Sequence, residues 1–164
     1  MVIAIMSDSH DNIWNVGKAV EIIKSRQAQV IIHCGDLVAP FILKELAKFE
    51  GPVHWVLGNN DGDQYLLTKL CLTELKNMEP HGFIGKLNFE EVAIAFTHYE
   101  EVGYALAHTG QYHLVCCGHT HAYRLQKIHQ TTLLNPGEVM GKDGPGTFCL
   151  FDTVTKEVKL LKLV

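Results

Sequence analysis

The sequence has no excess of positive charge and no hydrophobic run long enough to span a membrane. Its 164 residues include 14 Lys and Arg against 18 Asp and Glu, a formal net charge of −4. This charge gives no general attraction to nucleic acid or anionic lipid. The apolar start over residues 1–6 is too short for a membrane span or a signal segment and lacks a basic leader. We therefore expect a cytoplasmic protein that binds neither a membrane nor long nucleic acid.

Cysteine is present, but not in a pattern typical of a disulfide framework or a thiolate metal site. The five cysteines stand at positions 34, 71, 116, 117 and 149, with no Cys-x-x-Cys pair. An odd, scattered set is typical of a reducing compartment, where a buried cysteine serves as a small hydrophobic residue. Cys116 and Cys117 are neighbours on an expected strand, so their side chains should point to opposite faces. We expect free thiols and no thiolate zinc site.

The length and composition fit a single domain over residues 1–164 with an ordinary hydrophobic core. Hydrophobic residues make up 47% of the chain, and we find no internal repeat, linker or low-complexity stretch. In the first half, short apolar runs alternate with helical patterns. Strands are expected at 2–6, 30–33 and 53–57, and helices from residue 13, from Pro40 through Phe49, and over 63–77.

The second half of the chain is richer in strands. They are expected at 83–89, 91–96, 114–117, 123–128, 131–134, 147–151 and 158–163, with a short helix at 104–109. The alternation of strands and helices in the first half indicates parallel pairing. We predict an α/β fold in which two sheets pack face to face with helices outside.

Polar residues able to bind a metal follow five of these apolar strands. They form the motifs Asp8-Ser9-His10, Gly35-Asp36, Gly58-Asn59-Asn60-Asp61, Thr97-His98 and Gly118-His119-Thr120-His121. In α/β sheets ligands bind at the carboxyl ends of strands, so residues far apart in sequence can meet at one edge. A single motif is better explained as a turn or a structural histidine, although Gly-His-Thr-His is a stronger signal than the others. The five together indicate a metal site.

The spacing within these motifs suits a shared pocket. In extended backbone, residues i and i+2 project to the same side, which would let Asp8 and His10, and likewise His119 and His121, face one pocket. The glycines that precede three of the motif residues permit sharp turns and close backbone approach. Carboxylate, amide oxygen and imidazole together suit Mn, Fe, Co, Ni or Zn rather than calcium.

The ordered motif set resembles the calcineurin-like metallophosphoesterase superfamily. The short chain and the later Asn135-Pro136-Gly137 are similar to its small prokaryotic phosphodiesterases, often called YfcE-like. The resemblance covers nearly the whole chain and implies a four-layer α/β sandwich with a dinuclear metal centre. By that pattern, one metal would be held by Asp8, His10, Asp36 and His121, and the other by Asp36, Asn59, His98 and His119, with Asp36 bridging.

The resemblance implies a metal-dependent phosphoesterase, above all a phosphodiesterase, acting on small phosphate esters. Two divalent ions, with Mn expected first and Fe, Ni, Co or Zn as alternatives, can share a water and lower its pKa toward neutrality. The resulting metal-bound hydroxide would attack phosphorus, with Asp36 and Asn59 in the catalytic machinery.

Other functions and assemblies stay open. A non-catalytic protein-interaction scaffold of the same fold, such as a retromer coat subunit, is one alternative, although a scaffold needs no complete ligand set and this chain keeps all seven positions. A nuclease is another, against which the short chain without a capping domain or basic groove argues. A homodimer is one candidate assembly.

Three positions depart from the family pattern. Tyr99 follows His98 where the family usually has glycine, and Glu138 follows Asn135-Pro136-Gly137 where serine is common. Asn60 stands where many members carry a histidine thought to assist the leaving group, which YfcE-like relatives also lack. Asn60 and Tyr99 are candidates for contact with the substrate. Arg124 is a third candidate, although its strand parity is opposite to that of the Gly-His-Thr-His motif.

The remaining histidines have structural interpretations. His33 lies within an expected strand and His54 near the start of one, so core packing or a backbone hydrogen bond explains each. His81, His108, His113 and His129 are expected at the surface or in loops. Asp61 is the candidate partner that fixes the tautomer of a ligand histidine.

Overall fold

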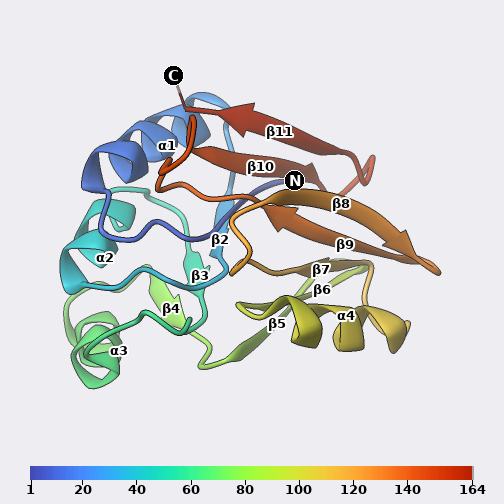
Figure 1. Cartoon of the computed structure of the whole chain (residues 1–164), viewed down its shortest axis with the longest axis horizontal. Helices are drawn as coiled ribbons and strands as arrows, with labels where there is room; N and C mark the ends of the chain where they lie inside the picture. Colours follow the sequence, from blue (N-terminus) through green and yellow to red (C-terminus); the bar gives the residue numbers. More distant parts are fainter. Residues whose placement is uncertain (164) are drawn as a thin grey trace.

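Two β-sheets pack face to face between two layers of helices in the computed structural model, which describes residues 1–163 (Figure 1). The first sheet has six strands in the order β11-β10-β1-β2-β3-β4: β1 (Val2–Met6), β2 (Val30–His33), β3 (Val53–Trp55), β4 (Met78–Pro80), β10 (Thr147–Asp152) and β11 (Val158–Lys162). The second has five in the order β5-β6-β7-β9-β8: β5 (Ile84–Phe89), β6 (Val92–Thr97), β7 (Leu114–Cys116), β8 (Tyr123–Ile128) and β9 (Thr131–Pro136).

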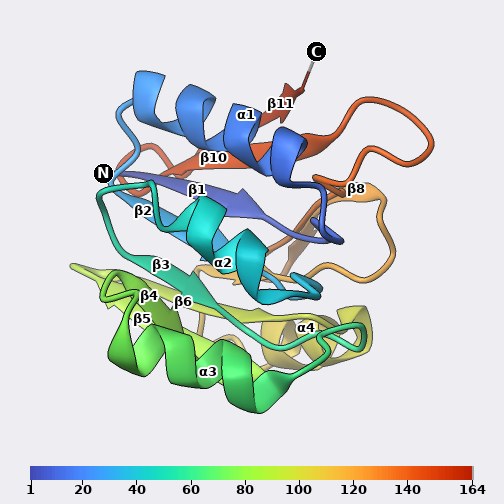
Figure 2. The same cartoon turned by 90° about the vertical axis from the view of Figure 1, so that its left-hand side faces the viewer.

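The helices cover the outer faces of both sheets. In Figure 2, α1 (Ile13–Ser25), α2 (Pro40–Leu46) and α3 (Gln64–Thr73) lie in front of the first sheet. The short helix α4 (Glu100–His108) packs on β6, β7 and β9 of the second sheet. The predicted α/β fold of two sheets flanked by helices is therefore confirmed.

Three hydrophobic cores separate these four layers, and strand alternation assigns residues to them. On β1, Ala4 and Met6 point toward the helices, whereas Ile3 and Ile5 join the core between the sheets. Cys116 likewise lies between the sheets, and its neighbour Cys117 lies under α4. The expectation that these two cysteines point to opposite faces is confirmed.

Most predicted elements are present, but several boundaries were wrong. The helix expected over 63–77 begins at Gln64, where the Asp63 side chain accepts a hydrogen bond from the Leu66 backbone, and ends at Thr73. The chain then forms β4, which the sequence did not predict because three residues containing a proline carry no apolar pattern. The helix from Pro40 ends at Leu46, and the helix expected at 104–109 spans Glu100–His108.

The parallel strands bring the loops that carry the polar motifs to one edge of the sandwich. Strands β1, β2, β3 and β4 run parallel in the first sheet, as do β6, β7 and β9 in the second. The loops that leave the carboxyl ends of β1, β2, β3, β6 and β7 carry the five polar motifs. Within residues 1–163, none of the helices combines the length and apolar character that crossing a membrane requires.

Candidate metal centre

The polar motifs adopt left-handed backbone rather than extended strand. The φ angle is positive at five of the seven predicted ligands: Asp8 (53°), His10 (38°), Asp36 (58°), His119 (70°) and His121 (60°). The extended-chain explanation for their common direction was therefore wrong. The loops are held by tertiary hydrogen bonds instead. The Asp8 backbone donates to the Gly35 carbonyl, and the His10 backbone donates to the Asp36 carbonyl, both at 3.1 Å. Aspartate and histidine tolerate this conformation better than most residues, at a cost of about 1–3 kcal/mol each.

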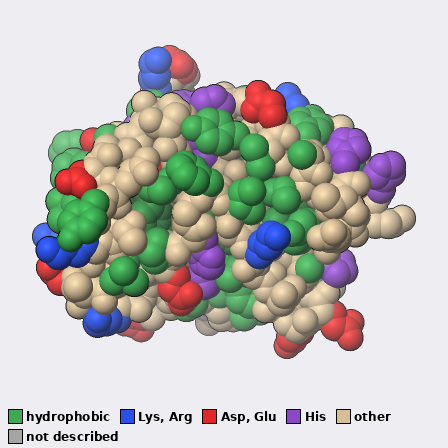
Figure 3. Space-filling model, turned by 90° about the horizontal axis from the view of Figure 1, so that it is seen from below, with side chains coloured by type: hydrophobic (Ala, Val, Ile, Leu, Met, Phe, Trp, Pro, Cys, Tyr) green, Lys and Arg blue, Asp and Glu red, His purple; other side chains and the backbone are tan. Residues whose placement is uncertain are grey.

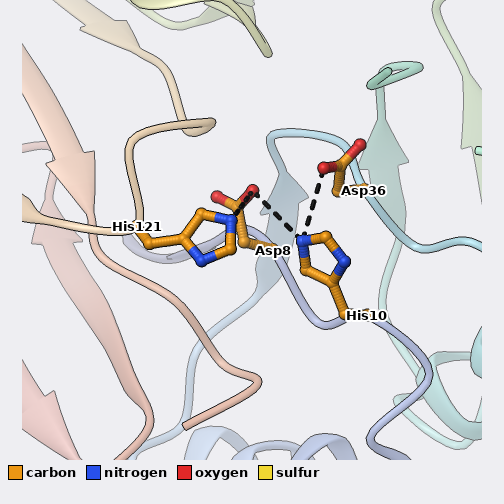
Figure 4. Close-up of side chains that lie close together, drawn as sticks. All are labelled: Asp8, His10, Asp36 and His121. Carbon is orange, nitrogen blue, oxygen red and sulfur yellow. Dashed lines mark ion pairs between the residues drawn. The ribbon is translucent and has the colours of Figure 1, made fainter. Parts of the chain in front are cut away.

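Four of the predicted ligands form one compact group, shown in Figure 4. Ligand atoms of Asp8, His10, Asp36 and His121 all lie within 4.8 Å of one another. His121 Nε2 lies 3.4 Å from Asp8 Oδ1, and His10 Nε2 lies 3.8 Å from Asp8 Oδ1 and 3.4 Å from Asp36 Oδ2. Carboxylate oxygens and imidazole nitrogens thus face a common centre.

The polar atoms of this group lack the partners that a purely structural cluster would have. Among the described residues, Asp8 Oδ1 and His10 Nε2 are buried and have no hydrogen-bond partner, whereas Asp8 Oδ2 accepts a hydrogen bond from the His119 backbone at 3.1 Å. An unpartnered buried polar atom costs free energy, and a carboxylate more than most. A bound cation would satisfy both atoms, so the residues present fit a metal ion.

The other predicted ligands form a second group that shares Asp36 with the first. His98 Nε2 lies 2.8 Å and His119 Nδ1 2.9 Å from Asn59 Oδ1. His98 Nε2 also lies 3.5 Å from Asp36 Oδ2. A single oxygen of Asp36 therefore lies between His10 of the first group and His98 of the second. The structure brings all seven predicted ligands together.

Outer hydrogen bonds set the tautomers of two of the predicted ligand histidines. His98 Nδ1 donates to the Cys34 carbonyl at 2.9 Å, which leaves the lone pair of Nε2 facing the second group. His121 Nδ1 donates to Glu138 Oε2 at 2.6 Å, which leaves the lone pair of its Nε2 facing Asp8. Imidazole ligands commonly donate their other nitrogen in this way. Sequence reasoning noted Glu138 as a departure from the family but missed this role.

Asp61 has a different task from the one expected. Its carboxylate accepts hydrogen bonds from the backbones of Gly58 at 2.6 Å, Val38 at 2.7 Å and Asp36 at 3.3 Å. Its partners are thus backbone amides rather than a histidine, and the prediction that it fixes a tautomer was wrong. Asp61 therefore joins the loops that follow β2 and β3. Three converging amides also satisfy a buried carboxylate better than one imidazole does.

The three candidate substrate contacts fall in different places. The Asn60 backbone and side chain donate to Asp36 Oδ1 at 2.8 Å and Oδ2 at 2.7 Å, so this residue holds the shared carboxylate. The Tyr99 ring lies beside the second group, with its centroid 5.2 Å from that of His98 and 5.3 Å from that of His119. Arg124 instead donates to the Tyr104 hydroxyl on α4 at 2.7 Å.

The electrostatics of the pocket favour positive charge. Burial, the largest influence on Asp8, raises the pKa of its carboxyl, but His10, Ser7 and the more distant histidines outweigh burial and lower that pKa. The pKa of His10 is raised, chiefly by Asp8, against the opposing effect of burial. Two almost fully buried carboxylates, Asp8 and Asp36, thus require protons on neighbouring imidazoles or a cation to balance them.

His33 contacts the loop after β1 and is not one of the predicted ligands. The side chain is fully buried, and its Nε2 lies 3.1 Å from the Ser9 hydroxyl in the loop after β1. Burial lowers the pKa of His33 to about 4, so the ring is neutral at physiological pH. The expected structural role of this residue agrees with its position.

A two-sheet α/β sandwich with carboxylate, amide and imidazole groups at its strand ends is the arrangement expected of a metal-dependent hydrolase. Known proteins agree with this class. The calcineurin-like phosphoesterase superfamily domain matches residues 1–156. The phosphodiesterase MJ0936 of Methanocaldococcus jannaschii is 32% identical over 169 residues, which cover 99% of each chain. The chain therefore belongs to the calcineurin-like phosphoesterase superfamily, and it is a phosphoester hydrolase.

Solved structures give the same result. A novel archaeal phosphodiesterase superposes with a TM-score of 0.92 at 30% identity, covering 99% of this chain and 100% of that one. YfcE, a phosphoesterase from E. coli, superposes with a TM-score of 0.71 at 15% identity over 100% of both chains, a likeness that extends to the fold alone. The predicted resemblance to this superfamily and its small phosphodiesterases is confirmed.

Proposed function

We propose that the chain is a phosphodiesterase that hydrolyses small phosphate esters with two divalent metal ions held side by side. One ion would be held by Asp8, His10, Asp36 and His121, and the other by Asp36, Asn59, His98 and His119. The observation that carries the proposal is the position of Asp36 Oδ2, 3.4 Å from His10 Nε2 and 3.5 Å from His98 Nε2. A carboxylate there can bridge two cations and offset part of their charge.

With two divalent ions bound, the proposed centre would have a net positive charge and would attract an anionic substrate. Of its members only Asp8 and Asp36 are anionic, while Asn59 and the neutral imidazoles add no charge. Two divalent ions would therefore keep an excess of positive charge, in a chain whose formal net charge is −4. Bound there, the ions would polarise the phosphoryl oxygens and lower the pKa of a shared water. The substrate is thus attracted by the centre itself.

Three residues outside the ligand set would control how the centre works. Asn60 would hold Asp36 in its bridging orientation through two hydrogen bonds. Glu138 would hold His121 with its ligand nitrogen deprotonated. Tyr99, beside His98 and His119, would form one wall for the ester group. Arg124 is not proposed as a substrate contact, because its guanidinium donates to the Tyr104 hydroxyl and pairs with Glu100 on α4.

Manganese is the metal that we propose to test first. A set of oxygen and imidazole ligands without thiolate suits Mn and, as alternatives, Fe, Co, Ni or Zn. The five cysteines are buried and free, as expected of a protein in the reducing cytoplasm, where we propose that it acts.

The rival functions have less support. A protein-interaction scaffold has no need of buried, unpartnered ligand atoms such as Asp8 Oδ1 and His10 Nε2. A nuclease for long nucleic acid would be expected to show a basic surface. On the face in Figure 3, lysine and arginine side chains are few and scattered, and several lie beside acidic ones. A small diester is therefore the substrate class that we favour.

The test is metal removal followed by reconstitution. The purified chain is stripped with a chelator, the metal loss is verified, and hydrolysis of bis-para-nitrophenyl phosphate is followed as Mn²⁺ is added back. We expect no turnover without metal and full turnover only when two equivalents are bound. His119→Ala should not recover, whereas His108→Ala, on the exposed side of α4, should. Turnover by the verified metal-free protein would refute the proposal, and full recovery with one equivalent would refute the dinuclear centre.

A further inference from the structure

A second cluster of metal-binding side chains lies on β3 and the edge strand β4, and it shares no residue with the centre described above. His54 on β3 is the register partner of Glu79 on β4, and His81 follows Glu79 by two residues. The three side chains therefore share one face of the sheet. His54 is buried, as expected, and His81, expected at the surface or in a loop, is half-buried just after β4. The two imidazoles contact each other.

The ligand atoms of this cluster have the spacing of a metal site. His54 Nδ1 lies 3.0 Å from His81 Nε2 and 3.3 Å from Glu79 Oε2, and all three atoms lie within 4.8 Å of one another. Around a tetrahedral zinc ion, ligand atoms at bond lengths of about 2.0–2.1 Å lie roughly 3.3 Å apart. Two of the three separations are thus close to those that an ion would impose.

The surroundings suit an open site at the edge of the sandwich. The His81 ring packs edge-on to Phe96 with centroids 5.2 Å apart, and the His54 ring lies 6.5 Å from Phe89. His54 is buried, whereas the Glu79 side chain is 52% exposed, so water can reach the ligand atoms from one side. Figure 3 views the molecule from below relative to Figure 1, and histidine side chains reach the surface on this face.

A hydrogen-bonded pair of imidazoles is the simpler explanation, and it accounts for only part of the geometry. One proton can link His54 Nδ1 to His81 Nε2. The carboxylate of Glu79 then competes for that same proton, because it faces the same nitrogen of His54. Burial lowers the pKa of both imidazoles, so both are neutral and have a lone pair available near neutral pH. Three converging ligand atoms with free lone pairs are explained better by a bound cation than by one shared proton.

We propose that His54, Glu79 and His81 form an additional zinc site, separate from the phosphoesterase centre, with its fourth position open to water. Two histidines and one glutamate with an open position are a ligand set that zinc uses in proteins. An ion there would tie the edge strand β4, a three-residue strand, to its neighbour β3. The site should thus stabilise this edge, and the inference does not depend on the proposed phosphodiesterase activity.

Zinc stoichiometry of the full chain in solution tests the proposal. The wild-type chain, Glu79→Gln and His81→Gln are each equilibrated with Zn²⁺, passed through a desalting column and analysed for bound metal. Glu91→Gln, which changes an exposed glutamate in the β5–β6 turn, is the matched control. We expect both cluster variants to retain one equivalent less than the wild type and the control. Equal stoichiometry in all four proteins would overturn the proposal.

Two further readouts test the site, one by locating the ion directly and one by its effect on stability. In crystals soaked with Zn²⁺, anomalous difference density should appear between His54 Nδ1, His81 Nε2 and Glu79. In solution, Zn²⁺ should raise the melting temperature of the Asp36→Asn chain, whose main centre is weakened, by more than that of Asp36→Asn with Glu79→Gln. Density without the additional equivalent in solution would mean binding at crystal concentration only, and it would overturn the proposal.

Discussion

His121 and Glu138 form a hydrogen bond of 2.6 Å between Nδ1 and Oε2, and this pair links the metal pocket to the loop that follows β9. The other oxygen of Glu138 accepts from the Lys142 backbone at 2.7 Å, which anchors the glycine-rich segment 141–146. A carboxylate behind a ligand imidazole raises its basicity and sets its tautomer. Glu138 thus couples the position of the loop after β9 to the orientation of the His121 ring.

Glu138→Gln should weaken metal binding without unfolding the chain. Glutamine keeps the size of the side chain but removes the charge that holds His121 Nδ1 protonated. We expect metal affinity at the first position to fall about 10–100-fold, the usual effect of losing such a partner. Metal titration of the stripped protein measures this. Glu157→Gln, at an exposed position, is the control, and equal affinities in the two variants would show that Glu138 does not tune the centre.

Asp36→Asn and Asp8→Asn should differ in the number of ions lost. Asp36 Oδ2 faces histidines of both groups, whereas Asp8 faces only His10 and His121 of the first. We therefore expect Asp36→Asn to weaken both metal positions and reduce turnover by more than roughly 100-fold, beyond the range of outer-residue changes. Asp8→Asn should weaken one position. Bound metal per chain, measured after dialysis, distinguishes the two, and two tightly held ions in Asp36→Asn would disprove the bridge.

Gly58→Ala should damage the centre through the backbone. A Cβ atom at Gly58 would overlap the carboxylate and the backbone nitrogen of Asp36, whereas one at Gly144 would meet no atom within 4 Å. We expect Gly58→Ala to lower the free energy of unfolding by about 1–3 kcal/mol, as overpacking does, and to weaken metal binding. Gly144→Ala should change neither by much. Urea unfolding of the stripped proteins provides the comparison, and equal midpoints would contradict the close approach.

Hydrolysis should depend steeply on the pKa of the leaving group. A positioned acid typically contributes 10²–10⁴-fold, most where the leaving alcohol is poorly acidic. Asn60 stands where many relatives carry a histidine, and its amide is bound to Asp36 and cannot protonate an alkoxide. We expect aryl diesters to react far faster than alkyl diesters. A rate series across leaving groups measures the slope, and a shallow slope would mean that another group supplies the proton.

His33 should make the stripped protein lose stability in mild acid. Burial lowers its pKa from 6.5 to about 4, so the unfolded chain takes up the proton at a higher pH than the folded chain does. The stabilising contribution of the neutral ring is complete above pH 6.5 and is lost as the pH falls toward 4, by up to about 3 kcal/mol. Unfolding free energies between pH 7 and 4 should fall less steeply in His33→Gln. Parallel curves would contradict the shift.

Local sequence patterns determined ten of the eleven described strands, the order of the motifs and the seven candidate ligands. Short apolar runs such as 2–6 and 30–32 are typical of strands buried on both faces, and the polar residues that follow them stand out against those runs. The family resemblance rests on the same residues. The features that depend on local residue patterns could therefore be predicted from the sequence.

Tertiary structure decided what depends on distant partners. The strand β4 exists because β3 offers it a pairing edge, and its own residues show no strand pattern. The left-handed turns at Asp8 and His121 are stabilised by neighbouring loops, so strand parity failed to explain their direction. The partner of His121 is Glu138, 17 residues later, and the partners of Asp61 are backbone amides that carry no sequence signal. Such contacts arise only when the sheets pack, because their geometry is set by the loops of several strands at once.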